Sequence, residues 1–103
     1  MSIFIDKSHD FKIRNDLCVN SNSIESLSIE ILNDNKTKNI ILNVTYRPPE
    51  GDLNFCEQYF RDFLTKTTKC KTNKNVVLAG DFNIDVLNFN NNKTIKNFVN
   101  LIF

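Results

Sequence analysis

The residues best suited to chemistry follow a short apolar segment in the second half of the chain. Residues 76–85 read Val-Val-Leu-Ala-Gly-Asp-Phe-Asn-Ile-Asp, and Gly80 allows a turn or a close approach of the backbone to a ligand. The continuous apolar run is typical of a strand buried on both faces. In an extended chain, Asp81 and Asn83 lie on one side and Phe82 points back into the packing. A carboxylate beside an amide at a strand end suits the activation of a group at a phosphate or a metal ion.

The same residues have a simpler interpretation. Asp and Asn are common in turns, because their side chains accept hydrogen bonds from the backbone two residues further along. An Asx-type turn that closes the strand would explain Asp81 and Asn83 without any function. Their spacing alone leaves both interpretations open.

A second polar corner is expected where residues 39–46, Asn-Ile-Ile-Leu-Asn-Val-Thr-Tyr, end in Arg47-Pro48-Pro49. The two prolines stop the strand, because proline has no N–H to donate to a neighbouring strand. Tyr46 and Arg47 are therefore presented at a rigid exit from the strand. A tyrosine in this position also fits a structural role, in which its ring covers the core and its hydroxyl reaches the surface.

The elements that must position these residues can be read from the hydrophobic pattern. Residues 24–32 alternate, with Leu27, Ile29 and Ile31 on one face and serines and Glu30 on the other. Glu25 shares the parity of the apolar face, which is unusual for a carboxylate. We expect it at the strand's edge and in solvent, and a buried polar role is the alternative. This strand and residues 39–46 are expected to form an antiparallel hairpin with a longer loop. Further short strands are expected over Ser2–Ile5, 11–14, 17–19 and 75–79.

Two segments have helical spacing. Asn54–Thr68 is expected to be a helix that begins with a capping box of Asn54 and Glu57. Its apolar stripe, which we interpret as core, consists of Phe55, Tyr59, Phe63 and Leu64. Residues 94–103 are expected to form a second helix, which ends in an apolar tripeptide.

Composition limits the class of protein. The 103 residues, 41% hydrophobic and 24% charged, fit a single soluble domain, and the net charge of +1 gives no general attraction to nucleic acid. Cys18, Cys56 and Cys70 are widely spaced, and no signal sequence precedes them, which predicts reduced thiols inside the cell, in the nucleus or cytoplasm. With His9 as the only histidine, in a polar turn, a zinc site is disfavoured. No stretch approaches the roughly 20 apolar residues of a membrane span.

The two polar corners, taken together and in this order, resemble a known family. A strand ending in Tyr46-Arg47-Pro48-Pro49, a helix rich in Phe and Leu, and a strand leading to Leu-Ala-Gly-Asp-Phe-Asn-Ile-Asp resemble the endonuclease/exonuclease/phosphatase superfamily. More narrowly, they are similar to the apurinic-endonuclease-like domain of non-LTR retrotransposons, the LINE-type and jockey-like elements. The resemblance covers essentially the whole chain. It implies a four-layer α/β sandwich of two sheets with helices outside.

The resemblance also implies a reaction and roles for particular residues. The family hydrolyses phosphodiesters or phosphate esters with Mg²⁺ and an in-line attacking water, here on DNA. Asp81 corresponds to the aspartate that orients and activates the water, and Asn83 to the amide that holds the attacking group and the phosphate. Tyr46 corresponds to the tyrosine that donates to the phosphate, and Arg47 is a candidate contact to the phosphate backbone. Asp85 is expected to be a turn residue after the active pair.

The resemblance places part of the family's site outside residues 1–103. The amino-terminal Asn and the metal-binding Glu would precede this region, and the Ser-Asp-His segment would follow it, so neither His9 nor Glu25 is assigned a matching role. Removing one group from such a site commonly costs on the order of 10²–10³ in rate. We therefore expect a central fragment of one domain that lacks the principal Mg²⁺ ligand and is inactive alone. A non-catalytic nucleic-acid-binding module and a remnant without function are the alternatives.

Overall fold

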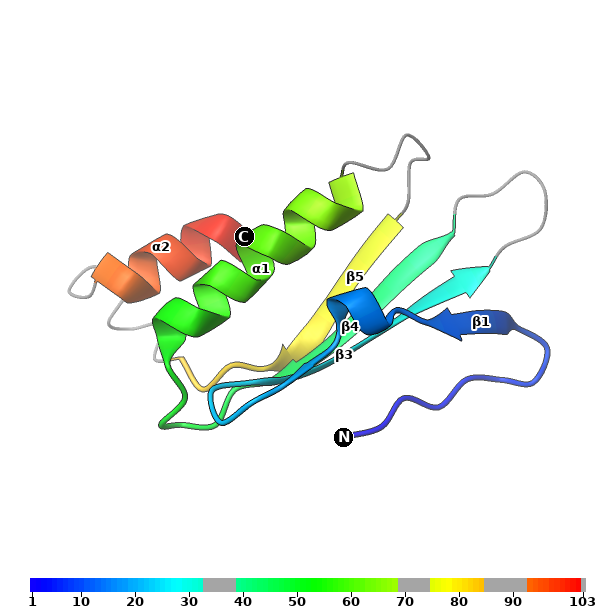
Figure 1. Ribbon diagram of the computed structural model, residues 1–103, viewed down its shortest axis with the longest axis horizontal. Helices are drawn as coiled ribbons and strands as arrows, with labels where there is room; N and C mark the ends of the chain where they lie inside the picture. The colour runs from blue at the N-terminus through cyan, green and yellow to red at the C-terminus, as the bar shows by residue number, and fades with distance from the viewer. Residues whose placement is uncertain (33–38, 69–74, 85–92, 103) are drawn as a thin grey trace.

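The computed structural model describes residues 1–32, 39–68, 75–84 and 93–102 as a mixed α/β fold, which confirms the expected fold class. The elements are β1 (Asp10–Ile13), the 3-10 turn η1 (Asn15–Leu17), β2 (Val19–Asn20), β3 (Glu25–Leu32), β4 (Ile40–Tyr46), α1 (Leu53–Thr68), β5 (Asn75–Asp81) and α2 (Lys93–Ile102). They form two layers, one sheet and one pair of helices (Figure 1). A second sheet is not among the described residues.

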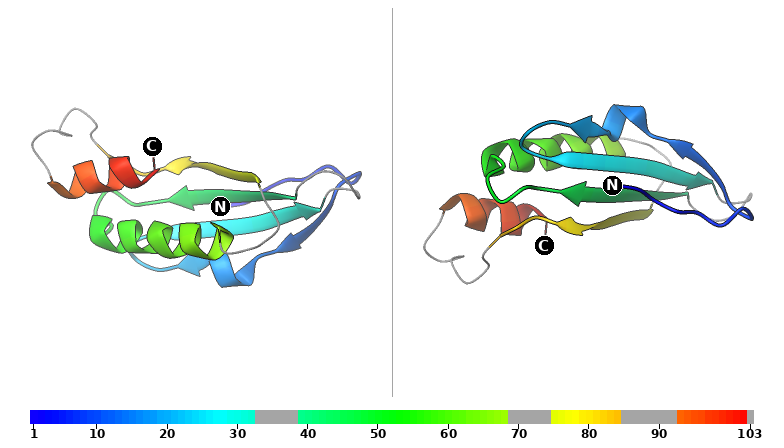
Figure 2. Two further views of the ribbon diagram at one scale, coloured as in Figure 1. Left: turned by 90° about the horizontal axis from the view of Figure 1, so that it is seen from above. Right: turned by 90° about the horizontal axis from the view of Figure 1, so that it is seen from below.

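The sheet has five strands in the order β1-β3-β4-β5, and the short β2 also pairs with β3. β3 and β4 form the expected antiparallel hairpin, with Glu25 opposite Tyr46 and Ile31 opposite Ile40. β4 and β5 are parallel and are connected through α1, because parallel neighbours need a long crossover. Both helices lie on one side of the sheet, which we call the inner face, whereas the outer face is turned away from them (Figure 2).

The hydrophobic core lies between the inner face and the helices. Phe60, Phe63 and Phe98 are almost completely buried, and the rings of Phe60 and Phe98 meet edge to face with centroids 6.0 Å apart. Phe82, which follows β5, packs against both of these rings, as the sequence predicted. The core of α1 is displaced from the expected stripe, because Cys56 and Phe60 are buried whereas Phe55 is 42% exposed.

The start of α1 also differs from the expected capping box. The Asp52 carboxylate accepts the Asn54 backbone N–H at 2.9 Å, so Asp52 caps the helix. Glu57 instead pairs with Arg61 one turn further along. Ser2–Ile5, expected to be a strand, has no regular secondary structure and crosses beneath the outer face (Figure 2).

Polar residues of β3 and β4 lie on the inner face, which reverses the expected orientation of β3. Ser26, Ser28 and Glu30 are buried, and the intervening apolar residues are on the outer face. Hydrogen bonds explain this arrangement. Asn43 donates to both serine hydroxyls, at 2.8 and 2.7 Å, and the Tyr59 hydroxyl of α1 lies 2.8 Å from the Ser26 hydroxyl and 2.5 Å from the Leu17 carbonyl oxygen to which it donates. No buried side-chain polar atom in the described part of the chain lacks a partner.

Glu30 is satisfied at the other end of the same face. Its carboxylate accepts from the Arg14 guanidinium at 2.7 Å and from the Asn39 amide at 2.7 Å. A buried carboxylate is tolerated only when it is paired and hydrogen-bonded, and here both oxygens have a donor. Polar pairing therefore replaces apolar packing over much of the layer between α1 and the sheet.

The outer face is apolar and open over much of its area. Phe11, Ile13 and Val77 are 50%, 55% and 47% exposed, and Leu27, Ile31, Leu42 and Val44 are partly exposed on the same face. The expectation that β5 is buried on both faces is therefore wrong. β5 lies at the edge of the sheet, and only Val76 and Leu78, on the inner face, pack against the core.

Removing the Tyr59 hydroxyl tests the buried polar layer. Tyr59→Phe deletes the donor to Leu17 and leaves Asn43 and Ser26 short of a partner, so we expect a loss of about 1–3 kcal/mol in the free energy of unfolding. Denaturant titration measures this loss. Tyr46→Phe is the matched control, because the Tyr46 hydroxyl makes no hydrogen bond to the residues that the structure describes, and it should change stability by less than about 0.5 kcal/mol. Equal effects would contradict the interpretation.

The buried thiol of Cys56 should make the free energy of unfolding decrease at alkaline pH. Burial raises the pKa of the Cys56 thiol to about 11, although the positive charge of Arg47 opposes this shift. The folded state therefore keeps the thiol neutral after the unfolded chain, near its ordinary value of 9.0, has ionised. This contribution is complete below pH 9 and is lost as the pH rises from about 9 to 11, on the order of 2 kcal/mol in all.

Melts across this pH range measure the effect. Cys56→Ala is the reference, because it removes the thiol and should show a flatter alkaline decline than the parent chain. A parent whose decline is no steeper than that of Cys56→Ala would contradict the assignment.

Candidate functional site

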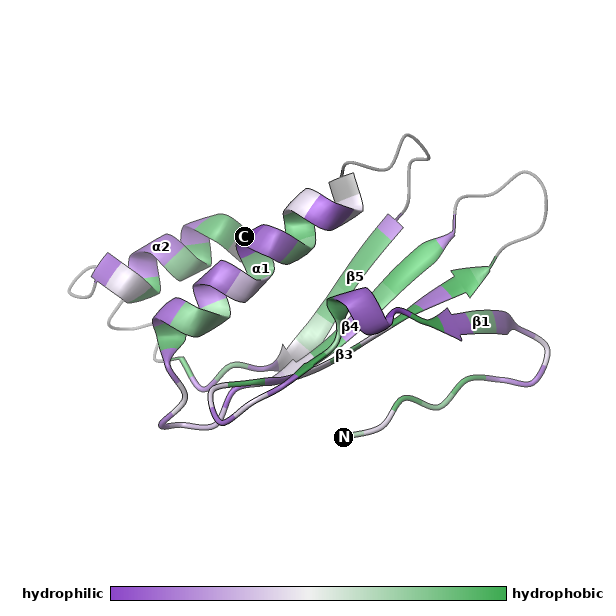
Figure 3. Ribbon diagram, viewed as in Figure 1, coloured by the Kyte–Doolittle hydropathy of each residue, from purple (hydrophilic) through white to green (hydrophobic). Residues whose placement is uncertain are grey.

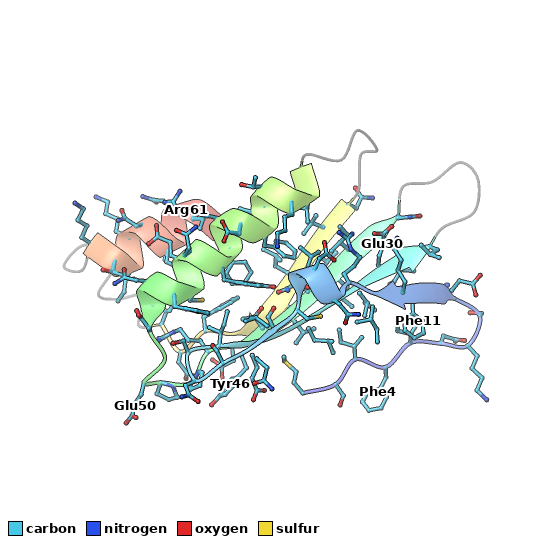
Figure 4. All side chains as sticks on the ribbon, viewed as in Figure 1. Phe4, Phe11, Glu30, Tyr46, Glu50 and Arg61 are labelled. Carbon is cyan, nitrogen blue, oxygen red and sulfur yellow. The ribbon has the colours of Figure 1, made fainter. Side chains whose placement is uncertain are left out.

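The two polar corners meet at one end of the sheet. Tyr46, the last residue of β4, is the register partner of Asp81, the last residue of the parallel strand β5. Strand alternation places both side chains on the outer face, and Tyr46 lies on the side away from the helices (Figure 4). Tyr46 is 39% exposed and Asp81 is also exposed. The structure thus brings together the phenol and the carboxylate that the sequence separates by 35 positions.

Arg47 links the two corners from inside the protein. Its side chain donates to the carbonyl oxygens of Phe82 and Asn83, both at 2.6 Å, and of Gly51 at 2.5 Å. Its backbone N–H also donates to the Asp81 carbonyl at 2.9 Å. Only 7% of the surface of Arg47 is exposed, and its guanidinium binds main-chain carbonyls of this chain. The buried position of Arg47 is unfavourable for the contact to a phosphate that the resemblance implies. That contact stays a prediction.

Asn83 is positioned by a turn and not by continuation of the strand. β5 ends at Asp81, and Asn83 has a positive φ of 49°, a left-handed conformation that asparagine adopts more readily than most residues. Its backbone N–H donates to the Asp81 carboxylate at 3.1 Å, which is the Asx-type turn of the simpler interpretation. Its amide nitrogen donates one N–H to the Arg47 carbonyl at 2.7 Å, so the amide oxygen and the second N–H are left for a ligand.

Glycines permit the close contacts around this corner. A Cβ on Gly80 would collide with the main chain of Thr45, its register partner in β4. A Cβ on Gly51 would collide with the Ser23 carbonyl oxygen and would press on the Arg47 side chain. The freedom at Gly80 is thus used for approach to a neighbouring strand.

A cavity lies beside the turn, between the end of β5 and α2. Its volume is about 330 Å³, and its lining is formed by Gly80, Asp81, Phe82, Asn83, Ile84, Phe98 and Val99. Polar atoms are thus present at one wall and aromatic or aliphatic groups at the others. This cavity was not predicted, because hydrophobic spacing locates α2 in the sequence but does not indicate that α2 packs beside the end of β5.

Glu25 belongs to the same row of residues. It is the first residue of β3 and the antiparallel partner of Tyr46, which is in turn the partner of Asp81. The outer face therefore carries Glu25, Tyr46 and Asp81 side by side at one end of three adjacent strands. The sequence already indicated this position, because Glu25 alternates in phase with the apolar residues of the same strand. Because carboxylates flank Tyr46 on both sides, this row has acidic character.

The described residues do not provide a complete metal site. In residues 1–32, 39–68, 75–84 and 93–102, no three His, Cys, Asp or Glu side chains are grouped so that they could hold a metal ion. Asp81 offers one carboxylate at the corner, which does not satisfy the Mg²⁺ that the resemblance implies. We therefore assign no chemical step to a metal. Asp85 and Cys70 lie outside the described residues.

Comparisons with known proteins give no match: no family model fits the chain, and no curated protein or solved structure is similar to it. No helix in the described part of the chain is long and apolar enough to cross a membrane. Among the described residues, Cys18 and Cys56 are free thiols.

Replacing Arg47 tests its linking role. Arg47→Met keeps much of the side-chain volume but removes every donor to Gly51, Phe82 and Asn83, so we expect a loss of about 2–4 kcal/mol in the free energy of unfolding. Arg61→Met is the control, because Arg61 is half exposed in an i,i+4 ion pair, and its loss should cost less than about 0.5 kcal/mol. Denaturant titration compares the two. Similar costs would refute a linking role for Arg47.

Proposed function

We propose that this chain is the central part of a phosphodiesterase domain of the endonuclease/exonuclease/phosphatase type, derived from the DNA endonuclease of a non-LTR retrotransposon. In this proposal the chain is inactive alone, because it holds only part of an active site. The proposal goes beyond the α/β fold and rests on the residues at one corner of the sheet.

The single observation that carries the proposal is the meeting of the two motifs. Tyr46 pairs with Asp81 across the parallel strands, and Arg47 bonds to the carbonyls of Phe82 and Asn83. Each motif alone fits an ordinary turn. Together they place an acid, a phenol and an amide at one exposed end of the sheet, which supports a site for a phosphate ester.

These groups suit hydrolysis of a phosphodiester. Asp81 would accept a hydrogen bond from the attacking water and take its proton as the oxygen bonds to phosphorus. Tyr46 would donate to a non-bridging oxygen, where negative charge increases during attack. The amide oxygen of Asn83 would accept a hydrogen bond from the water and orient it, while the bond from the amide nitrogen to the Arg47 carbonyl holds the side chain in place. The bond to the leaving oxygen then breaks, and that oxygen needs a proton or a cation.

The outer face of the sheet gives the proposal independent support. The apolar outer face of the sheet is left in water, and stable folds bury such a face against another layer. Val77 and Ile13 are about half exposed there. A second sheet packed on this face would bury them, as the four-layer sandwich of the proposal requires.

A plasmid-nicking assay tests the proposal. In Mg²⁺, we expect no nicking by this chain above the background of Asp81→Ala, because the leaving group and the metal lack their partners. A version extended on both sides with its neighbouring coding sequence should nick DNA, and Asp81→Ala in that version should lower the rate on the order of 10²–10³-fold.

Two results would refute parts of this proposal. Nicking by the 103-residue chain that Asp81→Ala abolishes would show that the chain is active alone. An extended version that folds but cleaves no phosphodiester would remove the nuclease assignment. Tyr46→Phe in the extended version separates a catalytic role of Tyr46 from a structural one, because it should lower the cleavage rate without changing the free energy of unfolding.

A further inference from the structure

In the part of the chain that the structure describes, no strand lies beside the outer edge of β5. Among the described residues, β5 pairs with β4 alone. The Asn75 N–H donates to Asn39, and the Asp81 carbonyl accepts from Arg47, so the odd-numbered residues of β5 face β4. In a parallel ladder, the N–H and C=O of the intervening residues Val76, Leu78 and Gly80 then point away from β4, toward the open edge.

The two edges of the sheet differ in their protection against further pairing. Natural edge strands are protected by lysines, prolines, bulges or short length. β1, at one edge, has four residues, of which Asp10 and Lys12 are charged. β5, at the other edge, contains neither lysine nor proline, and its register with β4 runs without a bulge from Asn75 to Asp81. Figure 3 shows the contrast, with hydrophilic colour on much of β1 and hydrophobic colour along most of β5.

The sequence of β5 is complementary to itself in the antiparallel direction. If two copies pair about Leu78, Leu78 faces Leu78 and Val76 faces Gly80, so the residues with outward groups exchange about six backbone hydrogen bonds. Between them Val77 faces Ala79, and Asp81, the only charged residue of the strand, faces the neutral amide of Asn75. A shift of two residues in either direction leaves some of these outward groups without a partner.

We propose that β5 pairs antiparallel with β5 of a second copy of this chain, about Leu78, to form a two-fold dimer with one continuous sheet. Figures 1 and 2 show α2 beyond the carboxyl end of β5, so the two-fold places the α2 helices of the two copies at opposite ends of the pair. The proposal is independent of the proposed function. The self-complementary register favours a second copy over an unrelated strand.

Sedimentation equilibrium over a wide concentration range tests the proposal. The expected result is reversible association between the 12.0 kDa chain and a species of twice that mass. Val77→Lys places a charge beside the paired edge, and Val76→Pro removes an outward N–H without breaking a bond to β4. Each should weaken the dimer at least tenfold, and circular dichroism identifies any variant that has failed to fold.

Phe11→Lys is the matched control for the outer face. It puts the same charge at a similarly exposed apolar position on β1, far from the β5 edge, and should leave the dimer unchanged. A dimer lost in Phe11→Lys but kept in Val77→Lys would place the contact on the outer face and overturn the proposal. A monomer at all concentrations, or open-ended assembly, would also overturn it.

Hydrogen exchange of the parent chain gives a readout that needs no variant. The amides of Val76, Leu78 and Gly80 should gain protection as the concentration rises, whereas those of Val77 and Ala79, already bonded to β4, should not change. Equal protection at low and high concentration for both sets would refute β5 pairing even if a dimer is found.

Discussion

The hydrogen bonds of the Arg47 guanidinium determine the shape of the candidate site. A buried cation is stable only if its donors are satisfied, and here the acceptors are carbonyl oxygens from the two loops that carry the site. Because Arg47 directly follows Tyr46, the same interaction that links the loops also fixes where β4 ends. The positive φ of Asn83 and the tight packing at Gly51 follow from this arrangement, since both bring a carbonyl within reach of the guanidinium.

The polar layer beneath α1 has a comparable role for the rest of the sheet. Ser26, Ser28 and Asn43 contribute little hydrophobic burial, but their hydrogen bonds to one another and to Tyr59 are satisfied in only one register of β3 against β4. A one-residue slip would turn the entire polar set to the outer face. The network therefore selects the register that aligns Tyr46 with Glu25, and through β5 with Asp81.

The sequence allowed the elements to be predicted better than their orientation. Alternation and helical spacing located β3, β4, α1 and α2 to within about two residues, because both periods follow directly from backbone geometry. Alternation cannot tell which face is covered, so the buried serines were missed, since their partners come from other elements. The apolar stripe of α1 was misplaced for the same reason, since helical spacing does not show which side of the helix faces the sheet. The polar strand ends at Asp81 and Tyr46 were predicted from the residue pattern, and their roles from the resemblance stay predictions. The inward direction of Arg47 depends on carbonyls more than 30 positions away.

The exposed outer face connects folding with the candidate site. Tyr46, Asp81 and Glu25 stand at the end of the same face that carries Val77, Leu42 and Ile31. Any layer that covers these apolar side chains must therefore also approach the polar row, and would supply the opposite wall of a site there. The acidic character of the row has a related consequence, because two carboxylates beside a phosphate repel it unless positive charge comes from that layer or from a bound cation. The energetic need to bury the outer face and the chemical need to complete the site would thus be met by the same contact.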